Sequence, residues 1–447
     1  MRIVNAAEMS RDQLEYLLTR PDVDAVEVTP EVMARTEETF GGPLTPLEVV
    51  QTILADVRER GDEALVHYAA AIDGVDLSSK GLFVTDAELE QAYQQVSKQF
   101  LADLDVAMDN IAAYHRKQVQ NSWITTGPHG NVLGQKVTPL ASVGAYVPGG
   151  TAPLVSTVLM TVVPAKVAGV KRVVVATPET KHGGLNPHII VAAHKAGASQ
   201  LLRVGGAQGI AALAYGTQSV EPVDKIVGPG NIYVTLAKKE VFGKVGIDSL
   251  AGPSEILVIA DDTANPRYVA ADLLSQAEHD PEAGVYLLTT SPELAEQVAQ
   301  EIKEHLALLP RREIAAQALT KSGVIVVCPD LETAAELSNI CAPEHLELAV
   351  AEPFALLDQI QNAGAIFLGH YASEPVGDYV AGPNHVLPTN GTARFSSPLG
   401  VYDFVKYSSI ISVTAKGLQQ LAPTGIRLAQ GEGLQAHARA MAIRFES

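Results

Sequence analysis

Apolar residues recur at helical spacing in the first quarter of the chain. Positions 44–72 and 86–118 carry them every three or four residues, which is the spacing of one buried helix face. Thr45 followed by Pro46 has the residue types that favour a helix start. The pattern therefore predicts helices over most of residues 45–120.

From residue 141 onward, short runs of Val, Ile and Leu alternate with helical stretches. Four runs lie within 143–228, at VGAYV, RVVVAT, LLRV and KIVG, and five lie within 255–369, at EILVIA, VYLLTT, GVIVVC, LELAV and AIFLG. This alternation predicts parallel sheets covered by helices. We expect an α/β fold with two incomplete Rossmann-like parallel-sheet domains and helical arms at both ends.

The expected domain boundaries lie where these patterns change. Residues 1–26 are predicted to form an N-terminal arm, and 142–255 one α/β domain. Residues 27–141 are expected to pack with 256–400 as a second, discontinuous domain. After 400 the alternation fades into one strand-like run, SIISVT, and two short helices, so 401–447 is predicted to be a C-terminal arm.

Composition limits the classes of partner and compartment. The 447 residues carry a formal net charge of −19, which argues against nucleic acid and anionic membranes as partners. The two cysteines, Cys328 and Cys341, are too few for a disulfide framework and favour a reducing, cytoplasmic location. No signal-peptide core and no apolar stretch of membrane-spanning length is present in the sequence.

Three predicted strands end in glycine-rich turns, at 146–150, 204–209 and 227–231. The carboxyl ends of parallel strands meet at one edge of a sheet, where glycines let a ligand approach and helix N-termini favour phosphate. The turns therefore favour a nucleotide or another anion. Because no GxGxxG motif is present, NAD binding does not follow from the motif alone, and a phosphosugar or acyl phosphate fits equally well.

Two segments have residue types suited to metal binding or proton transfer. Gln276 and His279 are three residues apart at a helix end and share a face, which could hold one edge of a metal site. On spacing alone a simple polar helix end is the better interpretation, because Gln is an uncommon zinc ligand. Glu344 and His345 stand side by side before a predicted strand. They offer two acid–base groups, with a surface loop as the alternative.

Two further segments lie near the C-terminus. The loop at 376–389 combines Gly and Pro with Asp378, which could complete a metal site, and with His385, which could contact substrate. Glu432 and His437 follow in the last helical run, where an isolated histidine is most often solvated.

Seven segments resemble histidinol dehydrogenases, and the resemblance runs from about residue 30 to the end. They are YVPGGTAPL, GGAQGIAALAYG, DKIVGPGNIYV, AGPSEILVIAD, DLLSQAEHD, APEHLEL and GPNHVLPT. The resemblance implies oxidation of L-histidinol to L-histidine through the aldehyde, the last step of histidine biosynthesis, with reduction of two NAD and one zinc ion per subunit. It also implies a homodimer whose exchanged C-terminal arms bring Glu432 and His437 to the partner's active site.

Site residues follow from the same resemblance. Glu344 and His345 are expected to be the acid–base pair. The zinc ligands are expected to be Gln276, His279, Asp378 and His437. The NAD contacts are expected to be Tyr146, Gln208 and Asn231. The substrate contacts are expected to be Ser254, Gln276, His279, His345, Asp378, Glu432 and His437, with His385 nearby.

Three other functions compete with this interpretation. A dehydrogenase of the same family could act on a different amino alcohol, and activity on a panel of alcohols distinguishes it. A zinc hydrolase would use the same Gln, His and Asp donors, but it leaves the glycine-rich turns unexplained. A nucleotide-binding scaffold would bind no zinc.

Overall fold

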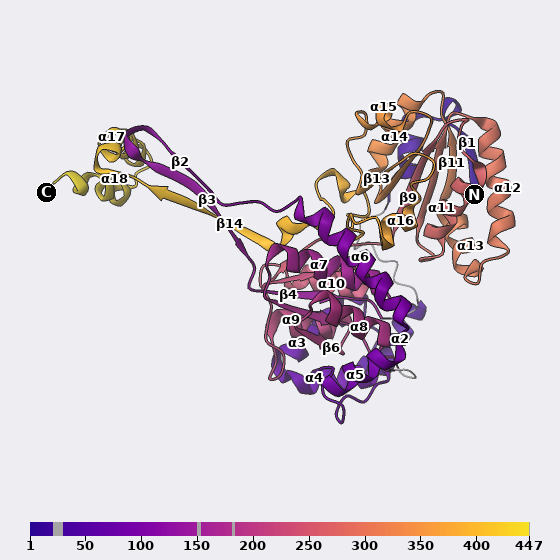
Figure 1. Ribbon diagram of the computed structural model, residues 1–447, viewed down its shortest axis with the longest axis horizontal. Helices are drawn as coiled ribbons and strands as arrows, with labels where there is room; N and C mark the ends of the chain where they lie inside the picture. Colours follow the sequence, from indigo (N-terminus) through magenta and orange to yellow (C-terminus); the bar gives the residue numbers. More distant parts are fainter. Residues whose placement is uncertain (21–29, 150–152, 181–183, 447) are drawn as a thin grey trace. The chain divides into compact units, whose positions relative to one another are not determined.

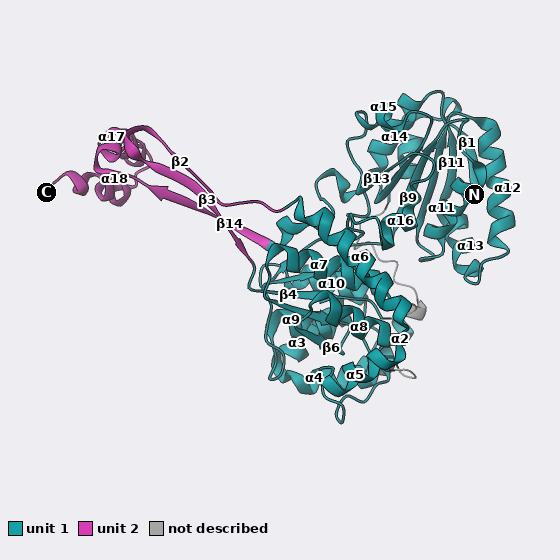
Figure 2. Ribbon diagram, in the orientation of Figure 1, with its two compact units in different colours: residues 1–118, 140–404 teal, residues 119–139, 405–447 magenta. Residues whose placement is uncertain are grey.

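The structure is a computed structural model that describes residues 1–20, 30–149, 153–180 and 184–446. The chain divides into two compact units, coloured separately in Figure 2. Unit 1 comprises residues 1–118 and 140–404, and unit 2 comprises 119–139 and 405–447. Among the described helices, none has both the length and the apolarity needed to cross a membrane.

One sheet of unit 1, here called the β4 sheet, has the strand order β6-β5-β4-β7-β8, with all neighbours parallel. Its strands are β4 (Ser142–Tyr146), β5 (Arg172–Ala176), β6 (Gln200–Leu202), β7 (Lys225–Val227) and β8 (Gly246–Ile247). On one face the core includes α7 (Val155–Ala168) and α8 (Pro187–Ala196), and on the other α9 (Gly206–Tyr215) and α10 (Ile232–Val241). The chain reverses its winding at β4, so a crevice is expected where β4 and β7 end.

The second sheet, the β9 sheet, has the order β1-β11-β10-β9-β12-β13, again parallel (Figure 1). Its strands are β1 (Arg2–Asn5), β9 (Glu255–Ala260), β10 (Gly284–Thr289), β11 (Gly323–Val327), β12 (His345–Ala349) and β13 (Ala365–Leu368). One face packs on α11 (Pro266–Ala277), α12 (Pro292–Leu306) and α13 (Arg312–Lys321). The other packs on α1 (Arg11–Leu18), α14 (Leu331–Cys341) and α15 (Pro353–Leu357). Here the winding reverses between β9 and β12.

Both sheets confirm the predicted fold class, and every strand run expected between 141 and 400 forms a strand. The reason is visible in burial: β4, β9, β10 and β12 are buried along their whole length, as parallel strands covered on both faces must be.

The helices between residues 46 and 116 differ from the expected domain assignment. They are α3 (Pro46–Arg60), α4 (Asp62–Tyr68), the π-turn η2 (Ala69–Asp73), α5 (Asp86–Gln95) and α6 (Lys98–Arg116). Thr45 caps α3 through a capping box with Glu48, as predicted. However, α3 packs on α9 and α10, and α6 packs on α7, so these helices cover the β4 sheet rather than joining the 256–400 domain. Helical periodicity shows which face of a helix is buried, but it does not show which helix or sheet covers that face.

The first twenty residues also differ from a simple arm. β1 extends the β9 sheet beside β11, followed by η1 (Ala6–Glu8) and α1, where Leu14 and Leu18 are buried. Residues 21–26 of the expected arm lie outside the described part of the chain. The next described element is α2 (Pro30–Phe40).

Unit 2 is an antiparallel sheet of order β14-β3-β2 with two terminal helices. Its elements are β2 (Trp123–Thr126), η3 (Pro128–Gly130), β3 (Val132–Pro139), β14 (Val405–Ser412), α17 (Ala415–Gly431), α18 (Gln435–Ala442) and η6 (Ile443–Phe445). The expected C-terminal arm thus begins at 405 and includes the hairpin 119–139. Residues 401–404, in η5 (Val401–Phe404), belong to unit 1.

Candidate active site

Glu344 and His345 lie at the edge where β12 begins, and both are buried. The chain leaves α14 through Ala342, whose φ of 50° turns it sharply toward Pro343 and the strand. β12 pairs with β9 in a register that places His345 beside Ile256. Because both side chains are buried, the alternative that Glu344 and His345 lie in a surface loop is excluded.

The backbone N–H and carbonyl groups of one residue, Glu255 in β9, orient both side chains. The N–H of Glu255 donates to Glu344 Oε2 at 3.0 Å, and the carbonyl oxygen of Glu255 lies 3.0 Å from His345 Nδ1. A carbonyl oxygen can only accept, so Nδ1 carries the proton and Nε2 is the free base in the neutral ring. Burial lowers the pKa of His345 to about 3, which keeps the ring neutral.

Three carboxylates surround this ring at somewhat greater distances. His345 Nε2 lies 3.8 Å from Asp378 Oδ1 and 3.9 Å from Glu374 Oε1, and Nδ1 lies 3.8 Å from Glu344 Oε2. Nε2 is buried and has no hydrogen-bond partner among the described residues. It is therefore available to accept a proton from a ligand. Burial also raises the pKa of the Glu344 carboxyl group well above its usual range. Glu344 therefore binds a proton more tightly than a solvent-exposed glutamate does.

The expected metal ligands of unit 1 come from two helices that contact each other, α11 and α16 (Glu374–Tyr379). Gln276 is fully buried in α11, and neither atom of its amide has a hydrogen-bond partner among the described residues. Burying an amide without hydrogen bonds costs free energy, unless a bound ligand or metal ion interacts with the amide. His279 follows α11, with its N–H bonded to the carbonyl oxygen of Gln276 at 3.2 Å. Asp378 lies in the last turn of α16.

Glu374 is a site residue that the sequence did not single out. It is buried one turn before Asp378, and its Oε2 accepts from the hydroxyl of Ser275 at 3.0 Å. One ligand atom from each of His345, Glu374 and Asp378 lies within 4.8 Å of the others. The i, i+4 spacing of the two acids on α16 is the signal that could have identified it.

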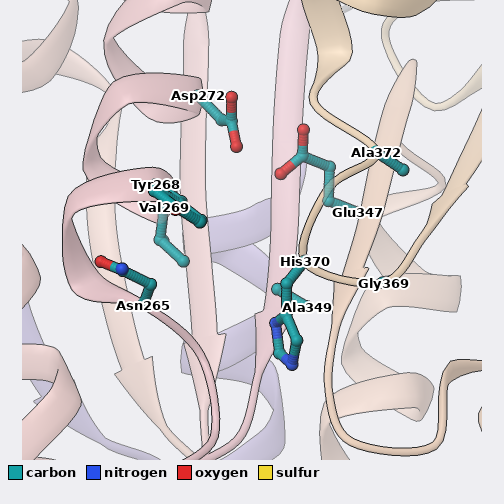
Figure 3. Close-up of a pocket in the computed structure, with 9 residues that line it drawn as sticks. All are labelled: Asn265, Tyr268, Val269, Asp272, Glu347, Ala349, Gly369, His370 and Ala372. Atoms are coloured by element: carbon teal, nitrogen blue, oxygen red, sulfur yellow. The ribbon is translucent and has the colours of Figure 1, made fainter.

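A small cavity of about 10 Å³, room for one water molecule, lies next to this cluster. Asp272 of α11 and Glu347 of β12 point toward each other across it (Figure 3). Burial raises the pKa of Asp272 to about 6 and that of Glu347 well above its usual range. The Glu347 carboxylate also accepts from the N–H of Glu374 at 2.9 Å. The acids of α11, β12 and α16 therefore form one buried hydrogen-bonded group.

Two other residues expected near the substrate lie on unit 1. Ser254 is half-buried, directly before β9. His385 lies in the loop after α16, and its Nε2 is buried without a hydrogen-bond partner in the part of the chain that is described. Burial lowers the pKa of His385 to about 4, so this ring is neutral.

The residues expected to contact NAD follow three strands of the β4 sheet at its carboxyl edge. Tyr146 ends β4, and its hydroxyl accepts from the N–H of Gly206 at 3.1 Å. Gln208 lies in the first turn of α9, with its amide 3.4 Å from Asp73 Oδ2. Asn231 caps α10 by accepting from the N–H groups of Tyr233 and Val234. Gly150 of the first glycine-rich turn lies outside the described residues.

The turn between β7 and α10 is held by a buried ion pair. The N–H of Gly228 donates to Asp248 Oδ2 at 2.7 Å, and Lys238 Nζ donates to the carbonyl oxygen of Gly228 at 3.0 Å. Lys238 also contacts the Asp248 carboxylate directly. Gly228 has a φ of 110° and lies so close to β4 that a Cβ there would be 2.2 Å from the carbonyl oxygen of Tyr146. Only glycine fits this junction.

The family model for histidinol dehydrogenase matches residues 44–445. The chain belongs to the histidinol dehydrogenase family. A histidinol dehydrogenase of Halalkalibacterium halodurans is 55% identical over 397 residues, covering 89% of this chain and 93% of the relative. One of a Synechococcus species is 51% identical over 447 residues, covering 100% of this chain and 99% of the relative. The predicted family is confirmed.

A crystal structure of histidinol dehydrogenase from Elizabethkingia anophelis is similar over the whole chain. It has 37% identity and a TM-score of 0.90, and the match covers 100% of this chain and 98% of that one. Both α/β sheets thus belong to a fold already known for histidinol dehydrogenases.

Two site residues predicted from the histidinol dehydrogenase resemblance lie in unit 2. Glu432 directly follows α17, and His437 lies in the first turn of α18. Both are exposed within the described chain. Both residues belong to unit 2, and their roles in metal and substrate binding stay predictions.

Proposed function

We propose that this protein oxidises L-histidinol to L-histidine through L-histidinaldehyde, with reduction of two NAD, as the last step of histidine biosynthesis. The observation that carries the proposal is the histidinol dehydrogenase family match over residues 44–445. The buried pair Glu344–His345, with a free Nε2 and a basic carboxylate, supplies the groups that such a reaction needs.

A zinc ion fits the donors of the proposed site. The orphaned amide of Gln276 offers an oxygen, and His279 and Asp378 offer an imidazole nitrogen and a carboxylate oxygen, all of which zinc accepts. His437 would be the fourth ligand. When bound, zinc would supply a positive centre that orients the substrate's imidazole and amine, and NAD would accept the hydride.

His345 acts in the first oxidation. Its Nδ1 proton is held by the carbonyl oxygen of Glu255, so Nε2 takes the proton of the substrate hydroxyl as hydride leaves the carbinol carbon. Because burial keeps this ring neutral in the free protein, the lone pair of Nε2 is free at neutral pH to accept a hydrogen bond from the substrate hydroxyl.

Glu344 acts in the second oxidation. Its carboxylate takes a proton from the water that adds to the aldehyde, and the resulting gem-diol loses the second hydride. Glu344 Oε2 is fixed by the N–H of Glu255, so the other oxygen is free to face the water. A buried site also protects the reactive aldehyde from bulk water.

Substrate and cofactor contacts complete the assignment. We propose that Tyr146, Gln208 and Asn231 contact NAD at the carboxyl edge of the β4 sheet. The substrate would contact Ser254, Gln276, His279, His345, Asp378, Glu432 and His437, with His385 nearby.

The proposed assembly is a homodimer in which C-terminal arms are exchanged, so that Glu432 and His437 reach the partner subunit's site. Support comes from unit 2, which exposes apolar side chains that a second copy would cover, at Ile124, Ile411, Leu421, Leu428 and Ile443. The proposed location is the cytoplasm, and the free, buried thiols of Cys328 and Cys341 are consistent with it.

The decisive experiment counts NADH formed per L-histidinol consumed, before and after treatment with a chelator. Two NADH, histidine as product and loss of activity on chelation are expected. One NADH per histidinol would mean that the aldehyde escapes and would overturn the role of Glu344. No turnover by folded, zinc-loaded dimer would refute histidinol as the substrate and direct the assay to other amino alcohols.

A further inference from the structure

Glu255 is a buried glutamate that contacts both residues of the acid–base pair, Glu344 and His345. Its backbone N–H bonds Glu344 and its carbonyl oxygen bonds His345, while its own side chain has no exposed surface. It begins β9, between β10 and β12, so the backbone that holds the pair is also the start of a central strand. Any movement of this residue is transmitted to both groups.

The guanidinium of Arg20 is the positive group that faces this carboxylate. Arg20 Nε lies 3.9 Å from Glu255 Oε2, with 9% of the arginine side chain exposed. Its other nitrogens donate to Ser322 Oγ at 3.2 Å and to the carbonyl oxygen of Glu282. The arginine is therefore fixed by two loops of the β9 sheet as well as by the charge that it faces.

The remaining neighbours of Glu255 would not replace this charge. Tyr286, Cys341 and Glu344 are close enough to interact electrostatically with Glu255, and each is neutral or negative. The backbone N–H groups of Glu344, Asn390 and Gly391 also favour the charged form of Glu255, but they carry no net charge. An isolated carboxylate is costly to bury, whereas one beside a cation is tolerated. Burial raises the pKa of Glu255 to about 7, and the Arg20 charge opposes that rise.

We propose that Arg20 is a positioning residue for the reaction: its charge holds the Glu255 carboxylate in place, and the backbone N–H and carbonyl groups of Glu255 in turn fix Glu344 and His345. Arg20 follows α1 and precedes residue 44, where the family match begins. The N-terminal segment thus contributes to the active site as well as to the edge of a sheet. The inference rests on the proposed function for its kinetic readout.

The consequence of losing Arg20 follows from this arrangement. The Glu255 carboxylate must then bind a proton or turn toward solvent, and either change alters the support of the pair. Displacements near 1 Å at a catalytic group can lower rates about 100-fold. The aldehyde step is the more sensitive one, because Glu344 interacts electrostatically with the Glu255 carboxylate as well as accepting from the Glu255 N–H. His345 contacts only the backbone carbonyl oxygen of Glu255.

The experiment is a double-variant cycle on the full-length protein. Arg20→Met removes the charge, Arg20→Lys keeps it, Glu255→Gln removes the carboxylate, and the double variant Arg20→Met/Glu255→Gln removes both. Rates are measured separately for L-histidinol and for supplied L-histidinaldehyde. Arg172→Met is the matched control. Arg172, which begins β5 of the β4 sheet, is also partly buried and donates to the carbonyl oxygens of Glu221 and Pro222.

Arg20→Met is expected to lower kcat for the aldehyde about 10- to 100-fold, with the KM for NAD and the zinc content unchanged. Arg20→Lys and the double variant should recover most of this loss, and Arg172→Met should leave the ratio of the two rates at the wild-type value. Wild-type rates in Arg20→Met, or a double variant no better than the single one, would overturn the proposal.

A second measurement does not depend on the reaction. The ¹⁵N shifts of His345 report which ring nitrogen carries the proton. The wild type should show a protonated Nδ1, and Arg20→Met should shift this signal while Arg172→Met leaves it in place. If the wild type fails to oxidise histidinol, the proposed function is refuted and these shifts still decide the role of Arg20: an unchanged signal in Arg20→Met would refute it.

Discussion

Lys238→Met tests whether the buried ion pair with Asp248 stabilises the β4 sheet and its ligand edge. The lysine and aspartate side chains are 2% and 5% exposed. Methionine keeps most of the chain length, so the main change is a buried carboxylate without the ammonium group that contacts it. Removing one partner of such a pair costs about 3–5 kcal/mol. Loss of the hydrogen bond to Gly228 O adds about 1 kcal/mol.

The assay is urea-induced unfolding, followed by the KM for NAD. We expect the free energy of unfolding to fall by about 4–6 kcal/mol, the sum of the two contributions. The KM for NAD should rise, because Asn231 follows the turn that Lys238 and Asp248 hold. Lys238→Met/Asp248→Asn should recover most of the stability, and the exposed control Lys171→Met should stay within about 0.5 kcal/mol of wild type. A change below about 1 kcal/mol in Lys238→Met would refute the reasoning.

Three further predictions address the proposed site and its surroundings. Glu344→Gln should slow aldehyde oxidation by about 10²-fold or more, because it removes the base, while alcohol oxidation falls far less; equal losses in separate half-reaction assays would contradict this division. His437→Ala should lower zinc per subunit and activity together, by about tenfold or more, and metal analysis showing full zinc with normal turnover would exclude it as a ligand. Burial raises the pKa of Asp73 to about 6, above its value in the unfolded chain. The folded state therefore binds this proton more tightly, and the free energy of unfolding falls as the pH rises from about 4 to 6. Asp73→Asn should therefore unfold like wild type near pH 4 and be about 1–2 kcal/mol more stable at pH 7.5, allowing for partial exposure; an equal difference at both pH values would contradict the assignment.

Much of the fold could be predicted because parallel strands are buried on both faces. EILVIA has its only charged residue at its first position and VYLLTT has its threonines at the end, and each forms a buried strand. β1 is only four residues long, and three of them are exposed, so nothing in its pattern distinguished it from an arm. The four residues of β2 are all exposed, and they too lacked a hydrophobic signal.

The candidate site could be predicted only as a set of residue types. Neighbouring Glu344 and His345 were visible, but their burial depends on β9 and α16, which are distant in sequence. Glu374 was missed because its i, i+4 spacing to Asp378 is also common on solvated helix faces, and the spacing alone does not reveal burial. Arg20 was missed because its partner lies more than 200 residues away. Long-range charge pairing leaves no periodicity to detect.

The two candidate ligand edges lie at opposite strand ends of the two parallel sheets, and this gives the two edges opposite electrostatic character. At the carboxyl edge of the β4 sheet, α9 and α10 begin, and the unpaired N–H groups of a helix start carry partial positive charge. At the edge where β9 and β12 begin, α11 and α14 end, and their last carbonyl groups carry partial negative charge. The backbone alone therefore favours an anion such as a pyrophosphate at the first edge and a cation at the second. The polarity of the helix dipoles agrees with the proposed placement of NAD at the β4 sheet and of zinc at the β9 sheet.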